Sequence, residues 1–272
     1  MVSTVPTKKT PVSKTEKTVA KRVKKKVSAV KEVLAVASEI YPLIKTGGLA
    51  DVVGALPSAL HTYGVHVTTL VPGYPRVMSA VRAQAQAKII LNLRDFFGSS
   101  VQLWSAQVAG MDLFVLDAPH LFEREGNPYL NANGQDWHDN PIRFAALSLM
   151  GAQLAWGEYP ELHYQPDAMH VHDWQTALAP VYLHYLGKGK HHPKTIITIH
   201  NLAFQGQFSA ELFPRLGLPA WAFSTEGLEY YGCVGYLKAG ILFSDEITTV
   251  SPSYAHEITT VNGGMGMDGL LR

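Results

Sequence analysis

Cysteine is nearly absent from this chain of 272 residues, in which Cys233 stands alone. A single cysteine cannot form an intramolecular disulfide, which excludes a disulfide-stapled secreted domain and favours a reducing compartment. Charged residues are also scarce, at 17% against about 25% in an ordinary soluble domain. Near the N-terminus the longest apolar run is Val33–Ala37, which is too short for a membrane span of ~18 residues or a signal-peptide core of ~7–15. We therefore predict no membrane partner.

Acidic residues are almost missing from residues 1–31, which hold ten basic side chains and one acid, Glu16. The rest of the chain carries 13 basic and 21 acidic side chains, a net charge of −8. Residues 1–31 also contain no aromatic residue and too little large apolar surface to offset the entropy of ordering, so we predict a disordered basic extension. Two alternatives are weighed for this segment, a basic arm for nucleic acid or an anionic surface and a transit peptide. We expect no nucleic-acid partner, because no aromatic residue is available to stack on bases.

Six short apolar runs recur between residues 32 and 272, and each ends at polar or turn-forming residues. Their length and β-branched content are typical of strands buried on both faces of a parallel sheet. The predicted strands are Val33–Ala37, Val65–Val71, Met111–Leu116, Ala168–Val171, Thr195–Ile199 and Ile247–Val250. The predicted helices between them include Asp51–Tyr63, Pro141–Gly157, Trp174–Leu186 and Gly235–Phe243. This alternation predicts one α/β domain over residues 32–272 with a Rossmann-like, doubly wound parallel sheet, although the strand order cannot be read.

A pair of glycines and a lysine follow the first predicted strand. Gly47 and Gly48 allow a ligand to approach the backbone, and the helix after them offers free N–H groups and a positive dipole end. Lys45 adds a positive charge two residues earlier. The combination suits a phosphate or diphosphate, although it matches neither a Walker loop nor GxGxxG.

Histidine and aspartate follow the fourth and fifth predicted strands. Ligands of open parallel sheets bind beyond the carboxyl ends of the strands, so Asp173 and His200 are candidates for general-base, orienting or sugar-hydroxyl contacts. His170 and His172 alternate along the strand and face the same side. A metal site is conceivable, but we favour side chains that hydrogen-bond one another or the backbone, because no second ligand motif accompanies them. No second carboxylate is identified as a partner for Asp173.

Three further features carry aromatic or hydroxyl side chains. The aromatic-rich segment 122–137, which includes Tyr129, reads as a surface loop that could line a sugar site. Ser251 is interpreted as a helix cap, because GxSxG is absent. Trp174 is expected in the core or in the lining of a pocket.

Together these segments resemble the glycosyltransferase family of bacterial glycogen synthases and plant starch synthases. The resemblance runs in order from about Glu32 to Arg272. Its most specific segments are Lys-Thr-Gly-Gly-Leu-Ala-Asp, starting at Lys45, and His-Asn-Leu-Ala-Phe-Gln-Gly, starting at His200. The other matching segments are Ser38–Ile44, Val52–Pro57, Val71–Tyr74, Pro128–Leu130, His170–Trp174, Tyr236–Gly240 and Thr249–Tyr254.

The resemblance implies transfer of glucose, with retention, from ADP-glucose to the non-reducing end of an α-1,4-glucan. It implies a fold of two Rossmann-like domains that face a cleft, of the GT-B type, with no metal or other cofactor. By analogy Lys45, Gly47 and Gly48 contact the donor diphosphate. Asp173, His200 and Asn201 face the glucosyl group, and Tyr129 helps to line the site.

The chain departs from this family pattern where a second, nucleotide-binding domain is expected to begin, near Arg272. We therefore expect an N-terminal portion that is inactive alone; the alternative is a non-catalytic glucan-binding module derived from a synthase. The expected location is the bacterial cytoplasm, with a plastid as the alternative. Neither the oligomeric state nor the choice between ADP-glucose and UDP-glucose follows from the residues themselves.

Overall fold

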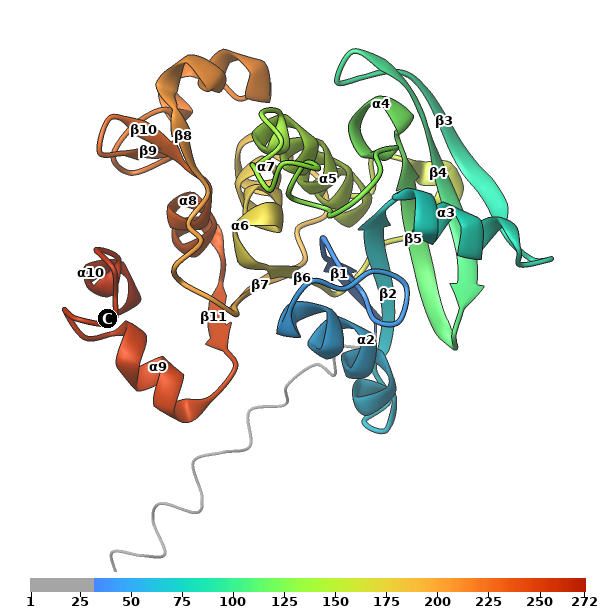
Figure 1. The fold of residues 1–272 in the computed structure, drawn as a ribbon, viewed down its shortest axis with the longest axis horizontal. Coiled ribbons are helices and arrows are strands. Elements are labelled where there is room, and N and C mark those ends of the chain that lie inside the picture. The colour runs from blue at the N-terminus through green and yellow to red at the C-terminus, as the bar shows by residue number, and fades with distance from the viewer. Residues whose placement is uncertain (1–31) are drawn as a thin grey trace, which may run out of the picture.

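The computed structural model describes residues 32–272, which fold around one mixed sheet of eight strands and a small second sheet (Figure 1). The predicted basic extension, residues 1–31, lies outside the described residues. The strands of the large sheet are β1 (Glu32–Val36), β2 (His66–Pro72), β3 (Lys88–Phe96), β4 (Ser99–Val108), β5 (Met111–Asp117), β6 (Ala168–His172), β7 (Lys194–Ile199) and β11 (Glu246–Thr249). The small sheet contains β8 (Gln207–Ser209), β9 (Glu229–Tyr230) and β10 (Cys233–Gly235).

The helices connect these strands and cover the large sheet. The α-helices are α2 (Gly48–His61), α3 (Pro75–Arg82), α4 (Pro119–Phe122), α5 (Asn140–Ala155), α6 (Asp173–Thr176), α7 (Leu178–Leu186), α8 (Tyr236–Phe243), α9 (Pro252–Ile258) and α10 (Asp268–Leu271). Short 3-10 helices occupy η1 (Pro160–Leu162), η2 (Ala210–Leu216) and η3 (Ala220–Ala222). None of the helices within residues 32–272 combines the length and the apolar character needed to cross a membrane.

The large sheet has the order β11-β7-β6-β1-β2-β5-β4-β3. The strands from β11 to β5 are parallel, which confirms the predicted doubly wound α/β class. The chain leaves β1 toward β2 on one side and later returns to pair β6 on the other side. β1 is therefore a topological switch point, and the crevice beyond its carboxyl end is the usual ligand site of such sheets.

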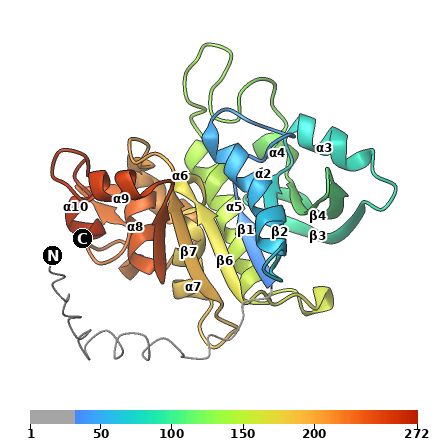
Figure 2. The same ribbon diagram turned by 90° about the horizontal axis from the view of Figure 1, so that it is seen from below.

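Strand β1 lies at the centre of the sheet and is buried on both faces. Leu34 and Val36 join the main hydrophobic core, whereas Val33 and Ala35 join a smaller cluster. Helix α5 packs against β1 and β2, and α2 packs against β2 and β5 on the opposite face (Figure 2). This double cover explains why the sequence of β1 is a continuous apolar run.

The antiparallel edge of the sheet is a hairpin that the apolar runs do not reveal. Strands β3 and β4 meet at a tight turn where Phe97 and Gly98 both have positive φ. Polar and apolar residues mix along both strands, because part of their surface is exposed to solvent. Continuous apolar runs indicate strands that are buried on both faces, so they do not indicate partly solvated strands such as β3 and β4.

Candidate functional site

A cavity of about 490 Å³ lies beyond the carboxyl ends of β1, β6 and β7. Six of the seven residues predicted for the site line it, although they come from four separate segments of the chain. They are Gly47, Gly48, Tyr129, Asp173, His200 and Asn201. Glu39, to which the sequence reasoning gives no role, lines the cavity as well. We call this cavity the candidate site.

The N-terminus of α2 opens onto the candidate site. The helix begins at Gly48, three residues before its predicted start, and its N-cap residue is Gly47. A Cβ atom added to either glycine would meet nothing within 4 Å, so the backbone there is open to a ligand. No side chain caps the helix, which leaves the first-turn N–H groups available to an anion.

Lys45 lies beside the candidate site rather than in its lining. Its Nζ is 2.6 Å from Oδ2 of Asp51, and the two side chains are 44% and 51% exposed. Exposed ion pairs are held weakly. The ammonium group can therefore exchange Asp51 for a more highly charged ligand.

Glu39 fixes the loop that precedes α2. Its carboxylate accepts hydrogen bonds from the backbone N–H of Thr46, from Oγ1 of Thr46 at 2.7 Å and from the hydroxyl of Tyr129 at 2.5 Å. The Tyr129 hydroxyl also lies 2.8 Å from Oγ of Ser38. Burial and the Glu39 charge raise the pKa of Tyr129 well above its usual value, so this hydroxyl keeps its proton. The position of Glu39 directly after a buried strand was the signal in the sequence that could have identified it.

Asp173 joins the loops that follow β6 and β7. Its Oδ1 accepts from the backbone N–H of His200 at 2.6 Å and from that of Asn201 at 3.4 Å. Its φ of 54° lies in the left-handed region, which Asp and Asn tolerate better than most residues. Burial raises the pKa of Asp173 to about 7, and the negative charge of Glu39 adds to this. The sequence identified no partner carboxylate for Asp173, whereas in the structure Glu39 lines the same cavity.

Three histidines form a buried stack behind the candidate site. The His172 ring lies 4.2 Å from that of His170 and 5.2 Å from that of His200, between centroids. Nε2 of His170 is 2.6 Å from Oγ1 of Thr198, and Nδ1 of His172 is 3.0 Å from Nε2 of His200. His170 and His172 thus each hydrogen-bond a side chain of β7 or of the residue just after it, rather than each other. No group of three or more His, Cys, Asp or Glu side chains in residues 32–272 is arranged to hold a metal ion.

The geometry of the stack determines which nitrogen of His200 carries a proton. Burial lowers the pKa of His170 and His200 to about 4 and holds that of His172 well below its usual value, so all three rings are neutral at pH 7. Nε2 of His172 is buried and has no partner among the described residues. Because a buried N–H without a partner is the less favourable choice, we assign the His172 proton to Nδ1, which donates to Nε2 of His200. His200 then carries its own proton on Nδ1.

A second cavity, of about 580 Å³, adjoins the candidate site and shares five lining residues with it, Thr46, Gly47, Tyr129, Gln175 and Phe204. Aromatic side chains line much of it, among them Trp174, Phe204 and Phe208. Gly206 has a φ of 62°, and a Cβ there would come within 2.7 Å of the Trp174 ring. The backbone at Gly206 therefore packs directly against the Trp174 ring. Trp174 lies in the lining of a pocket, one of the two places predicted for it. We call this cavity the aromatic cavity.

Comparisons with known proteins bear on the family and the fold of the chain. The family model described as starch synthase catalytic domain matches residues 32–272. A glycogen synthase of Rhodopseudomonas palustris (strain ATCC BAA-98 / CGA009) and one of Methylocella silvestris are each 56% identical over 240 residues, which is 88% of this chain and 48% of each relative. The solved catalytic domain of Starch Synthase IV from Arabidopsis thaliana, bound to ADP and acarbose, is 27% identical with a TM-score of 0.75. That likeness covers 89% of this chain and 49% of the solved one. The chain thus spans about half the length of the curated relatives it matches.

Proposed function

The chain belongs to the starch synthase catalytic domain family, and from this membership we propose that it forms one wall of the active site of a retaining glucosyltransferase. The proposed reaction transfers glucose from ADP-glucose to the non-reducing end of an α-1,4-glucan. The observation that carries the proposal is the convergence of Glu39, Asp173 and His200 on one cavity beside the N-terminus of α2. A sugar with a charged leaving group needs this pairing of polar residues with an anion site.

The donor diphosphate is assigned to the N-terminus of α2. The first-turn backbone N–H groups of α2 have no side-chain cap and are free to bind an anion, and the helix dipole adds favourable potential. Lys45 leaves Asp51 to neutralise the departing diphosphate, a task for which a fixed cation or a metal ion is otherwise used. The chain outside residues 1–31 has a net charge of −8, so this local positive potential is what attracts an anionic donor.

The glucosyl group is assigned to Asp173, His200 and Asn201. With its proton on Nδ1, His200 can donate one hydrogen bond to a sugar or phosphate oxygen. The acceptor glucan is assigned to the aromatic cavity, because sugar rings stack on aromatic faces. Tyr129 lies in the lining of both cavities and marks the point where donor and acceptor meet.

The test uses a chimeric enzyme in which residues 32–272 replace the matching half of the Rhodopseudomonas palustris glycogen synthase. We expect the chimera to elongate glycogen from ADP-glucose, whereas the 272-residue chain alone shows little elongation. Lys45→Ala should raise the KM for ADP-glucose about tenfold, the smaller end of what a charge-assisted hydrogen bond contributes. His200→Ala should mainly lower kcat. An inactive but folded chimera would favour the non-catalytic glucan-binding alternative.

The choice of ADP over UDP and the cellular location are the finer parts of the proposal. ADP is supported by the starch synthase IV structure, which is bound to ADP. A bacterial cytoplasmic location is supported by the bacterial relatives and by the single cysteine. A side-by-side assay of ADP-glucose and UDP-glucose with the protein from its native source tests which nucleotide base the donor carries. A fluorescent fusion tests the cellular location.

A further inference from the structure

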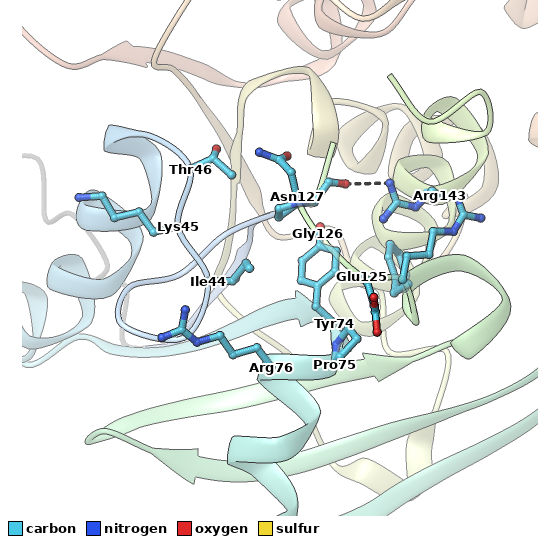
Figure 3. A pocket seen from close by; sticks show the side chains of 13 residues that line it. Ile44, Lys45, Thr46, Tyr74, Pro75, Arg76, Glu125, Gly126, Asn127 and Arg143 are labelled. Atoms are coloured by element: carbon cyan, nitrogen blue, oxygen red, sulfur yellow. Dashed lines mark hydrogen bonds between the residues drawn. The ribbon is translucent and has the colours of Figure 1, made fainter. Parts of the chain in front are cut away.

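A separate pocket of about 380 Å³ lies beside the candidate site, with Thr46 in the lining of both (Figure 3). It is built from the loop before α2, the start of α3, the segment after α4 and one side of α5. None of Glu39, Asp173 and His200 reaches it. The function proposed above uses only Lys45 from this pocket and leaves the rest of it without a role.

The lining of this pocket is strongly basic. It contains four cationic side chains and one acid, Glu125, although the surrounding protein is acidic overall. Two of the cations are already paired, Lys45 with Asp51 and Arg124 with Asp139. The remaining two, Arg76 and Arg143, form no ion pair with any carboxylate in the described part of the chain.

Arg143 is a buried cation whose partners are all neutral. Its side chain is 1% exposed. Nε donates to the carbonyl of Leu121 at 2.7 Å, and Nη1 donates to the carbonyl of Pro128 at 2.8 Å and to Oδ1 of Asn140 at 2.6 Å. The carboxylate whose charge acts on Arg143, that of Asp139, is already paired with Arg124. A buried charge without an ion pair of its own is costly, and an anion in the pocket would supply one.

Tyr74 adds a buried donor. The residue is 4% exposed, and its hydroxyl has no hydrogen-bond partner within residues 32–272. Figure 3 shows its ring standing between Ile44 and Glu125, with Arg76 extending beneath the Ile44 loop. A buried hydroxyl without a partner costs free energy, which a ligand oxygen would recover.

We propose that this pocket binds a small oxyanion of the phosphate type, either inorganic phosphate or the phosphate group of a monosaccharide phosphate. Guanidinium groups match the geometry of phosphate oxygens, and the Tyr74 hydroxyl provides a further donor. The exposed carboxylate of Glu125 opposes the anion and limits its affinity. The inference is independent of the proposed function, because phosphate binding requires no turnover of ADP-glucose.

The test is a calorimetric titration of the 272-residue chain with inorganic phosphate at constant ionic strength. We expect saturable binding that Arg76→Gln weakens about tenfold and Tyr74→Phe weakens two- to tenfold. Arg94→Gln is the matched control, since Arg94 is also exposed but lies on β3, outside the pocket. Glu125→Gln should change the affinity in the opposite direction and strengthen binding severalfold.

Three results would overturn the proposal: no saturable binding, equal binding by the Arg76→Gln and Arg94→Gln variants, or weaker binding in Glu125→Gln. A second titration with a hexose monophosphate, using the neutral hexose as its control, distinguishes the two sources. Tighter binding of the hexose monophosphate assigns the pocket to a sugar phosphate, and equal binding assigns it to free phosphate. Because all these positions except Tyr74 are exposed, a folding defect cannot imitate the charge-dependent pattern.

Discussion

The two sides of the candidate site differ in how their charges are controlled. On one side, Asp173, His172 and His200 are wholly or largely buried, and burial shifts the pKa of each. On the other side, Lys45 and Asp51 are about half exposed and form an ion pair in contact with water. The buried side therefore has a fixed geometry and histidines that stay neutral at pH 7, whereas the exposed side has a charge that can move. A glucosyl group needs the first property and a departing diphosphate needs the second.

The largest expected effect is that of Asp173→Ala, compared with Asp51→Ala on the exposed side. The substitution Asp173→Ala leaves the backbone N–H groups of His200 and Asn201 without an acceptor and places an alanine at a φ of 54°. We expect a loss of about 2–4 kcal/mol in the free energy of unfolding and a fall of at least about a hundredfold in kcat of the chimera. Urea denaturation measures the free energy of unfolding, and a glycogen-elongation assay measures kcat. Equal stability of the Asp173→Ala and Asp51→Ala variants would show that burial does not distinguish the two sides.

The next effect is a pH dependence that belongs to the buried side. The pKa of Asp173 is raised to about 7 in the folded chain from 3.8, because the carboxyl group is buried. A raised pKa contributes stability that is fully present below pH 3.8 and is lost as the pH rises to 7. Asp173→Asn keeps an acceptor oxygen but does not titrate, so the stability of the original chain relative to this variant should fall between pH 4 and pH 7. The change in this relative stability between pH 4 and pH 7 is a few kcal/mol at most, since one pKa unit corresponds to about 1.4 kcal/mol.

Urea titrations of both proteins at several pH values check this expectation. His170 and His200 titrate in both, with pKa values lowered to about 4 by burial, so their contribution cancels in the difference. If the original chain instead became more stable relative to the Asp173→Asn variant as the pH rises, the assigned direction of the pKa shift would be wrong.

A smaller effect is expected from His172→Phe, which keeps an aromatic ring but removes the partner of His200. We expect kcat of the chimera to fall ten- to a hundredfold, about the range for residues that orient a functional ligand, with little change in the KM for ADP-glucose. Nitrogen-15 NMR of labelled histidine should show the His200 proton on Nδ1 in the original chain and a mixture of tautomers in the variant. A His200 proton on Nε2 in the original chain would contradict the assignment. His184→Phe is the control, because His184 lies outside the candidate site.

The sequence predicted the buried side better than it predicted the rest of the molecule. Strand β1 and its parallel neighbours are continuous apolar runs, and the polar residues that follow them identified Asp173 and His200. The hairpin of β3 and β4 was missed because its strands are partly solvated. The role of Glu39 was missed because its partner Tyr129 lies 90 residues away along the chain and reaches it only through a tertiary contact. A sequence places residues along strands, but it does not show which loops meet.

The smallest expected effect is the contribution of the Lys45–Asp51 ion pair to stability. A double-mutant cycle of Lys45→Ala, Asp51→Ala and the combined variant should give a coupling free energy of about 0–0.5 kcal/mol, because both side chains are about half exposed and their attraction is screened by water. Unfolding in urea at low and high salt measures it, and the coupling should shrink toward zero in high salt. A coupling above about 1.5 kcal/mol would mean that Lys45 is held by Asp51 as firmly as a buried pair. Lys45 could then not leave Asp51 for a diphosphate, and the contrast between a fixed and a movable side of the site would fail.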